Sequence, residues 1–291
     1  MTETVVSMGL PVDEHLIIKK NRIEPEVTKG NEKRIAVVTG THGDELEGQF
    51  VCYELNRRIM ENISCLRGIV DIYPALNPLG IDSISRGVPM FDLDMNRIFP
   101  GTPEGPMMET VVGQLMDDIA GADMCIDIHA SNIFLEEMPQ VRINEETAQT
   151  LVPFADLAYS LNSTGVPTLV VEMGVGMRIT KQYGYQLVEG ILNLMKQMGI
   201  WDGPVVEVRK PIISSDGKVG FVNADCPGIY LPEARIFDKV KKGNVIGKVV
   251  NPLTGDIVQE VTAPIDGMVF TRREYPIVYS GSLLNRILGG Y

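Results

Sequence analysis

A polar segment of six residues stands between a strand-like run and a helical pattern near the first third of the chain. The apolar run at 35–38 reads Ile-Ala-Val-Val, residues 40–45 read Gly-Thr-His-Gly-Asp-Glu, and apolar residues recur at helical spacing over 44–60. A strand that passes into a helix through such a turn is typical of an α/β sheet, where ligands usually bind at the carboxyl ends of the strands. Residues 40–45 therefore predict a fold class and the place of a site.

The same alternation continues along the chain. Strand-like runs occur at 69–73, 124–128 and 168–171, and helical patterns at 106–119 and 181–198. These elements predict a mostly parallel or mixed sheet flanked by helices. Residues 1–33 are expected to form edge strands or an irregular lead-in. Residues 75–101 have neither a helical nor a strand period, and loops of this length are usually functional.

After residue 203 the pattern changes to short alternating runs separated by turn signals, without a convincing helix. We therefore predict a domain over 1–203 and a small all-β, barrel-like module over 204–291. Residues 240–247 and 263–269 resemble the two halves of a biotinyl/lipoyl-like barrel. Because Lys248 lies in a strand pattern and not at a tip between the halves, we interpret the module as a structural or pocket-shaping appendage, not a carrier arm.

Charge and cysteine usage restrict the partners and the compartment. A net charge of -12 over 291 residues argues against nucleic acid or an anionic membrane as the main partner. The four cysteines show no paired spacing that would suggest a zinc ribbon or a disulfide framework. Neither a leader pattern nor a run of apolar residues long enough to span a membrane is present. We expect a cytoplasmic protein.

Two of the three histidines follow strand-like runs. His42 and Glu45 lie three residues apart in the first turn, and His129 follows the run at 124–128, so a doubly wound sheet would bring all three to one edge. Two imidazoles and one carboxylate would provide three ligands for a Zn²⁺ ion and leave its fourth coordination position open. This arrangement is typical of a catalytic site, with one Zn²⁺ per chain. Asp127 is the candidate to orient His129. The alternative is an ordinary glycine turn whose histidines only form hydrogen bonds. His15 has no such motif around it, and we expect it to be a surface residue.

Further polar residues suggest hydrolysis of an amide. Glu172 ends a buried strand and is the candidate general base and acid. Arg97, beside Asn96, can grip a substrate carboxylate. Arg86, earlier in the same loop, can stabilise an oxyanion. For Glu172, Arg86 and Arg97 the alternative is a solvated charge.

Five motifs occur in order along the chain: the turn with His42 and Glu45, residues 77–80, residues 96–101, residues 127–129, and Glu172. In these motifs and in their order the sequence resembles the succinylglutamate desuccinylase and aspartoacylase family of the zinc carboxypeptidase superfamily. The resemblance covers roughly residues 34–200. It implies zinc on His42, Glu45 and His129, with Glu172 as base and then acid. It also implies that Arg86 polarises the scissile carbonyl and that Asn96 and Arg97 hold the substrate carboxylate. Arg142 and Arg178 are further candidates without a clean motif match.

The leading hypothesis is a zinc-dependent amidohydrolase that removes an acyl group from a small N-acylated amino acid or related carboxylate by attack of zinc-bound water. A metallocarboxypeptidase acting on a peptide terminus and a non-catalytic binding protein on the same fold are the alternatives. We expect a small-molecule substrate and neither a nucleic-acid nor a membrane partner. A homo-oligomer is compatible with the sequence.

Overall fold

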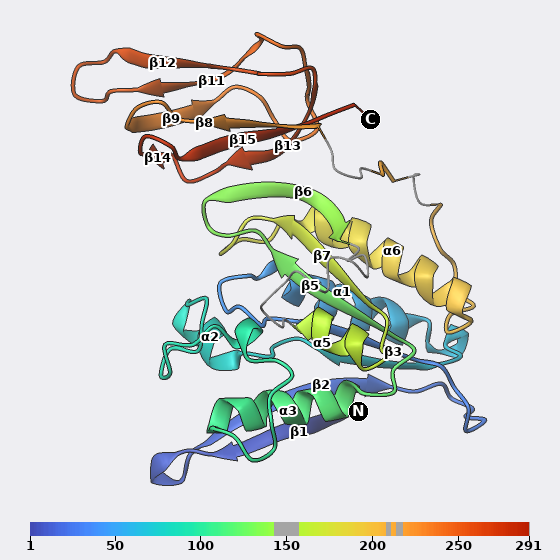
Figure 1. The fold of residues 1–291 in the computed structure, drawn as a ribbon. Helices are drawn as coiled ribbons and strands as arrows, with labels where there is room; N and C mark the ends of the chain where they lie inside the picture. The colour runs from blue at the N-terminus through green and yellow to red at the C-terminus, as the bar shows by residue number, and fades with distance from the viewer. Residues whose placement is uncertain (143–156, 208–210, 214–217, 291) are drawn as a thin grey trace. The chain divides into compact units, whose positions relative to one another are not determined.

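The computed structural model describes residues 1–142, 157–207, 211–213 and 218–290 (Figure 1). Contacts between residues divide the chain into two compact units. The first comprises Met1–Ala130, Val141–Glu172 and Met177–Val208, and the second comprises Ser131–Gln140, Met173–Gly176 and Arg209–Tyr291. The predicted boundary at residue 203 stays a prediction, and the contacts add two short segments that precede this boundary to the C-terminal unit.

The first unit is built on a mixed sheet in the strand order β1-β2-β4-β3-β5-β7. β1 and β2 form an antiparallel hairpin, β2 is antiparallel to β4, and β3 is parallel to both β4 and β5. The strands are β1 (Thr2–Gly9), β2 (His15–Ile23), β3 (Arg34–Thr39), β4 (Ile69–Tyr73), β5 (Met124–Ala130) and β7 (Thr168–Gly174). The predicted α/β fold with a mixed sheet is confirmed, and the lead-in is an edge hairpin.

Helices cover both faces of this sheet, as the alternating strands require. Ala36 and Val38 of β3 pack in one buried cluster with residues of α3 and α5. Ile35 and Val37 are also fully buried and, by the alternation of a strand, point to the opposite face. The helices are α1 (Glu47–Glu61), α2 (Pro78–Ser83), α3 (Met107–Ile119), α5 (Leu157–Ser163) and α6 (Lys181–Met198). The predicted helices at 106–119 and 181–198 match α3 and α6.

Two helix assignments differ from the sequence pattern for local reasons. α1 begins at Glu47 and not at residue 44, because the preceding polar segment forms a turn before the helix. The loop at 75–101 contains α2 and a single 3-10 turn, Met95–Arg97. α2 has Pro78 in its first turn and a cap in which Asn77 Oδ1 accepts from Gly80 N. A helix of 6 residues is too short to produce a periodic pattern.

The second unit is all β in its described residues. One group of strands has the order β6-β13-β15-β8, with β10 on β13, and a separate sheet has the order β12-β11-β9-β14. Their apolar side chains share one buried cluster. The strands are β6 (Leu135–Arg142), β8 (Lys218–Asn223), β9 (Gly228–Pro232), β10 (Lys239–Val240), β11 (Val245–Val250), β12 (Ile257–Thr262), β13 (Gly267–Arg273), β14 (Ile277–Val278) and β15 (Leu283–Gly289).

Lys248 lies inside β11, as its sequence pattern indicates, and its Nζ is 2.8 Å from Glu233 Oε1. A lysine in a strand and in an ion pair does not resemble the exposed tip of a carrier arm. Within the described residues, no helix is both long and apolar enough to cross a membrane.

Candidate metal centre

Parallel pairing of β3 and β5 brings the two candidate histidines to one edge of the sheet. Thr39 lies opposite Ile128 in the register, so the chain reaches His42 just after β3 and His129 near the end of β5 at the same level. β7 runs in the same direction as its neighbour β5, because Cys125 N at the start of β5 donates to Pro167 O just before β7. The carboxyl ends of all three strands therefore meet at this edge.

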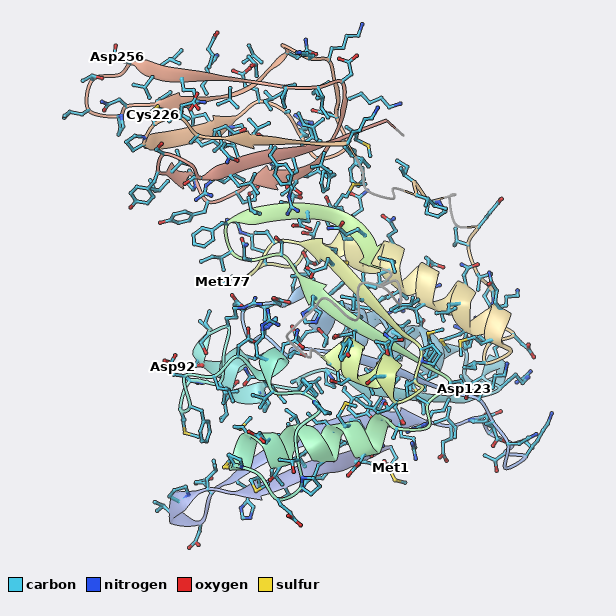
Figure 2. All side chains as sticks on the ribbon, in the orientation of Figure 1. Met1, Asp92, Asp123, Met177, Cys226 and Asp256 are labelled. Carbon is cyan, nitrogen blue, oxygen red and sulfur yellow. The ribbon has the colours of Figure 1, made fainter. Side chains whose placement is uncertain are left out.

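Figure 2 shows the two sides of the first unit. Asp92, from the loop after β4, and Met177, just after β7, are on one side, and Asp123, directly before β5, is on the other. Met177 N also donates to Asp44 O at 2.6 Å, which ties the segment after β7 to the turn after β3. The turns that carry the candidate residues are thus held together by backbone hydrogen bonds.

The glycines of residues 40–45 allow this turn to pack against the loop after β4. Gly40 has a φ of 71°, in the left-handed region that favours glycine. A Cβ on Gly43 would lie 2.0 Å from the carbonyl carbon of Gly80, and Gly43 N donates to Arg86 O at 3.2 Å. The sequence Gly-Asp-Glu after His42 therefore reflects close backbone packing as well as chemistry.

His42, Glu45 and His129 are all buried, and each offers one ligand atom within 4.8 Å of the other two. His42 Nδ1 is 2.9 Å from Glu45 Oε1, and His129 Nδ1 is 3.0 Å from Glu45 Oε2. The contact of His42 lacks hydrogen-bond geometry, so its buried Nδ1 has no hydrogen-bond partner. Buried nitrogen and oxygen ligands that converge with one nitrogen unsatisfied fit a divalent metal ion such as zinc.

The outer nitrogen of each imidazole faces a carboxylate. His129 Nε2 is 3.1 Å from Asp127 Oδ2, and His42 Nε2 is 3.1 Å from Asp94 Oδ1. Such carboxylates fix the tautomer and orientation of metal-binding histidines. The sequence suggested Asp127 through its spacing from His129, but reasoning from the sequence missed Asp94. Asp94 is 52 residues from His42, and only the motif Asp-Met-Asn-Arg at 94–97 marks it in the sequence.

The local charges favour a bound cation. Burial alone would lower the pKa of both imidazoles, but Asp94 and Glu45 outweigh it at His42, and Asp127 and Glu45 outweigh it at His129, so both pKa values are raised. Burial alone would raise the pKa of Glu45, but the hydrogen bond with His129 and the close approach of His42 hold this pKa well below its usual range. A metal ion would take the place of protons that this negative environment otherwise attracts.

Arg86, Asn96 and Arg97 differ in their contacts and in their burial. Arg86 Nη1 donates to Glu45 Oε1 at 2.9 Å. Asn96 is buried, and its Oδ1 accepts from Leu157 N at 3.1 Å, which leaves its amide group as the donor for a ligand. Arg97 is exposed and donates to the backbone carbonyl of Asn96. The structure thus brings Arg86 to the ligand group and gives Asn96 an additional structural role.

Three further candidates lie on or after strands β6 and β7. Glu172 is half-buried near the end of β7, one strand away from His129 on β5. Arg178 is exposed in the segment after β7. Arg142 is the last residue of β6, and its side chain is outside the described part of the structure.

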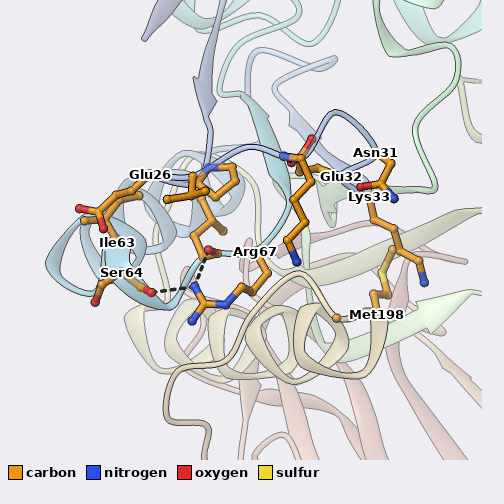
Figure 3. Close-up of a pocket in the computed structure, with 13 residues that line it drawn as sticks. Glu26, Asn31, Glu32, Lys33, Ile63, Ser64, Arg67 and Met198 are labelled. Carbon is orange, nitrogen blue, oxygen red and sulfur yellow. Dashed lines mark hydrogen bonds between the residues drawn. The ribbon is translucent and has the colours of Figure 1, made fainter.

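A cavity of about 590 Å³ occurs elsewhere in the first unit (Figure 3). It is lined by the loop before β3, by residues after α1 and by the end of α6, and Arg67 at its wall donates to the carbonyls of Ser64 and Leu66. Lys33, which precedes β3, lines this cavity, whereas His42 follows β3. The cavity is therefore separated from the candidate metal centre by the length of that strand, about 20 Å.

Comparison with known proteins agrees with the geometry. Residues 31–158 match the family model described as the succinylglutamate desuccinylase/aspartoacylase catalytic domain. N-alpha-acetyl-L-2,4-diaminobutyric acid deacetylase from Halomonas elongata is 25% identical over 274 residues, which cover 85% of this chain and 80% of that protein. Residues 31–158 therefore resemble the catalytic domain of the succinylglutamate desuccinylase/aspartoacylase family, and the resemblance predicted from the motifs is confirmed.

Solved structures show the same fold. The product-bound ectoine utilization protein EutE (DoeB) from Ruegeria pomeroyi has a TM-score of 0.78 at 19% identity, covering 98% of this chain and 94% of that chain. A succinylglutamate desuccinylase/aspartoacylase from Rhodobacter sphaeroides has a TM-score of 0.76 at 22% identity, covering 100% and 95% of the two chains. The likeness extends over both units of the chain.

Asp94→Asn is expected to weaken zinc binding by about 10- to 100-fold, because an amide removes the negative charge that orients His42. The matched control is Asp92→Asn, which changes an exposed residue of the same loop and should leave the affinity unchanged. Competition with a chromophoric chelator measures both. Wild-type affinity in Asp94→Asn would exclude this role.

A metal ion held by His42, Glu45 and His129 is expected to dissociate on acidification at a pH above the ordinary pKa of histidine. Binding needs neutral imidazoles, and the raised pKa values of His42 and His129 mean that protons compete at a higher pH than usual. The zinc affinity should therefore be highest in mildly alkaline solution and should fall as the pH is lowered towards and through about 6.5. An affinity that is constant from about pH 8 to 5.5 would contradict this prediction.

Proposed function

We propose that the protein is a zinc-dependent amidohydrolase that removes an acyl group from a small N-acylated amino acid. The observation that carries the proposal is the buried group of His42, Glu45 and His129, with an unsatisfied nitrogen on His42 and a carboxylate behind each imidazole. The donor set suits zinc, and other divalent ions accept similar ligands. The resemblance of residues 31–158 to a deacylase family supports an amide as the bond that is cleaved.

His42, Glu45 and His129 would hold the ion, with Asp94 and Asp127 orienting the two imidazoles. A bound divalent ion supplies Lewis-acid chemistry, polarising a carbonyl oxygen and making a water molecule more acidic. These five side chains fix the position of that chemistry, because each is buried or tied to a buried partner.

Glu172 acts first as the base that takes a proton from the attacking water and then as the acid that gives it to the leaving amine. Arg86, beside Glu45, donates to the oxygen on which negative charge develops. Arg97 and the amide group of Asn96 bind the substrate carboxylate. The roles of Arg86 and Asn96 are compatible with the hydrogen bonds that they already make, since each retains donors for a ligand.

The relatives support a small substrate. The Halomonas elongata relative is named for the deacetylation of an acetylated diamino acid, and the Ruegeria pomeroyi structure for the utilisation of ectoine. A peptide end remains the alternative substrate for the same machinery. A binding protein that lacks catalysis is the second alternative.

One substrate comparison tests the proposal. Zinc-loaded protein is assayed with a panel of N-acetyl and N-succinyl amino acids and, at equal concentration, with unblocked dipeptides and tripeptides. The proposal expects kcat/KM to be at least about 100-fold higher for one N-acyl amino acid than for any peptide, a difference of about 3 kcal/mol in transition-state binding. Preferred cleavage of peptides would support the carboxypeptidase, and binding without hydrolysis would support the binding protein.

A further inference from the structure

Two segments of the C-terminal unit begin directly after residues of the candidate site. The chain enters that unit at Ser131, two residues after His129, and again at Met173, immediately after Glu172. Any movement of these segments is passed to His129 and Glu172 through the backbone. The contacts that hold the segments 131–140 and 173–176 in place therefore influence the positions of His129 and Glu172.

The two segments are tied to each other near their starts. Gly176 N donates to Asn132 O at 3.2 Å, and a Cβ on Gly176 would come within 3.1 Å of Ile133. Asn132 also shapes the turn through its side chain, whose Oδ1 accepts from the backbone nitrogens of Phe134 and Leu135. The contact between the segments is thus a backbone packing contact that leaves little space for sliding.

The first segment is anchored by β13. Leu135 lies opposite Arg273 in the antiparallel register of β6 and β13, and Phe134 O accepts from Glu274 N at 2.8 Å. The Phe134 ring packs edge-on against Tyr275 with centroids 5.6 Å apart. The guanidinium of Arg273 lies over the same ring, 5.4 Å from its centroid.

Arg273 is a buried arginine with an unusual set of partners. Its guanidinium donates to three backbone carbonyls, those of Tyr275 at 2.8 Å, Ile277 at 2.9 Å and Leu283 at 3.2 Å. No carboxylate of the described residues forms an ion pair with it. Burial lowers the pKa of this arginine, which reflects the free-energy cost of the charge there. A rigid fork of donors joins separate backbone segments in a way that an apolar side chain cannot.

We infer that Arg273 is a positioning residue of the candidate active site: it fixes Phe134 and the turn at 131–135, and through Asn132 and Gly176 it sets the direction in which the chain leaves His129 and Glu172. This inference rests on the proposed roles of those two residues.

Hydrogen exchange of the metal-free protein tests the inference without relying on activity. Arg273→Met removes the donors and keeps a long apolar stem, and Arg235→Met changes an exposed arginine of the same unit as the matched control. We expect faster exchange in peptides that cover 129–135 and 172–176 in Arg273→Met, unchanged exchange in β11 and β12, and no change in Arg235→Met. Unchanged exchange at 129–135 and 172–176 in a folded Arg273→Met protein would overturn the inference.

A second readout uses the zinc-loaded protein. Arg273→Met is expected to lower the zinc affinity and kcat each by about 10-fold or more, with KM changed by less than about threefold, because the ligand and the base move but the substrate carboxylate site does not. A lower melting temperature with wild-type zinc affinity and kcat would reduce Arg273 to a structural residue. If wild-type protein neither binds zinc nor hydrolyses N-acyl amino acids, the proposed function is wrong. The hydrogen-exchange experiment would still show whether Arg273 fixes the segments at 129–135 and 172–176.

Phe134→Leu provides an independent variant if Arg273→Met does not fold. Phe134 is 41% exposed, so shortening its side chain should cost little stability. The same increase in exchange at 129–135 is expected, since the ring that Arg273 covers is lost. Wild-type exchange in this variant would also contradict the inference.

Discussion

Glu172→Gln is expected to reduce kcat by about 10²- to 10⁴-fold while leaving the zinc content at the wild-type level. Glutamine keeps the size of the side chain at the end of β7 but cannot carry the proton from the attacking water to the leaving amine. The loss corresponds to about 3 to 5 kcal/mol in the activation barrier. Because Glu172 is not one of the three proposed ligands, metal binding and catalysis should separate in this variant.

The measurement is steady-state hydrolysis of the best N-acyl amino acid at saturating concentration, alongside elemental analysis of the same sample. Glu207→Gln is the control, because Glu207 is exposed in the same unit and remote in sequence from the proposed site residues. A kcat within about tenfold of the wild type would show that another group carries the proton. Loss of the metal in Glu172→Gln would instead make Glu172 a ligand.

Asp71→Ala is expected to lower the free energy of unfolding by about 3 to 5 kcal/mol. Asp71 is fully buried on β4 and accepts from Arg22 at 2.8 and 2.7 Å and from Arg34 at 3.1 Å. Lys20 Nζ, also buried, lies 3.8 Å away. The hydrogen bonds of Asp71 raise the pKa of Arg22. Without this carboxylate, several partly buried positive charges lose their shared partner.

Urea denaturation measures this effect, and Asp202→Ala is its control. Asp202 also forms an ion pair, with Arg67 at 2.7 Å, but both side chains are about half-exposed. An exposed pair contributes at most about 1 kcal/mol. If the free energy of unfolding falls by at most about 1 kcal/mol in both variants, the contacts of Asp71 with Arg22, Arg34 and Lys20 do not stabilise the fold as proposed.

The local signals in the sequence were sufficient for the main fold and for the grouping of His42, Glu45 and His129. The apolar run at 35–38 and the periodic helices at 106–119 and 181–198 correspond to β3, α3 and α6. His42 and His129 could be grouped from the sequence because parallel neighbours place the turns after their strands at one edge. Asp127 could be connected with His129 because they are two residues apart.

Contacts between distant segments could not be predicted in this way. Asp94 lies behind His42 because the loop after β4 folds back over the turn at 40–45, and no spacing in the sequence encodes that return. Likewise, β6 pairs with β13 although the paired residues lie 134 to 138 positions apart in the sequence. A strand pattern indicates that a segment will pair but does not identify its partner. The position of Arg273 beside Phe134 depends on that pairing.

Metal content shows whether His42, Glu45 and His129 form a zinc site. Protein purified without a chelator or a histidine tag is analysed for bound metals, together with His42→Ala. We predict about one zinc per chain in the wild type and loss of that zinc in the variant, because two ligands alone do not form a stable catalytic zinc site. A wild-type protein that carries no metal and takes up no added zinc would contradict the proposed zinc-dependent hydrolysis. A non-catalytic binding protein on the same fold would then be the better interpretation.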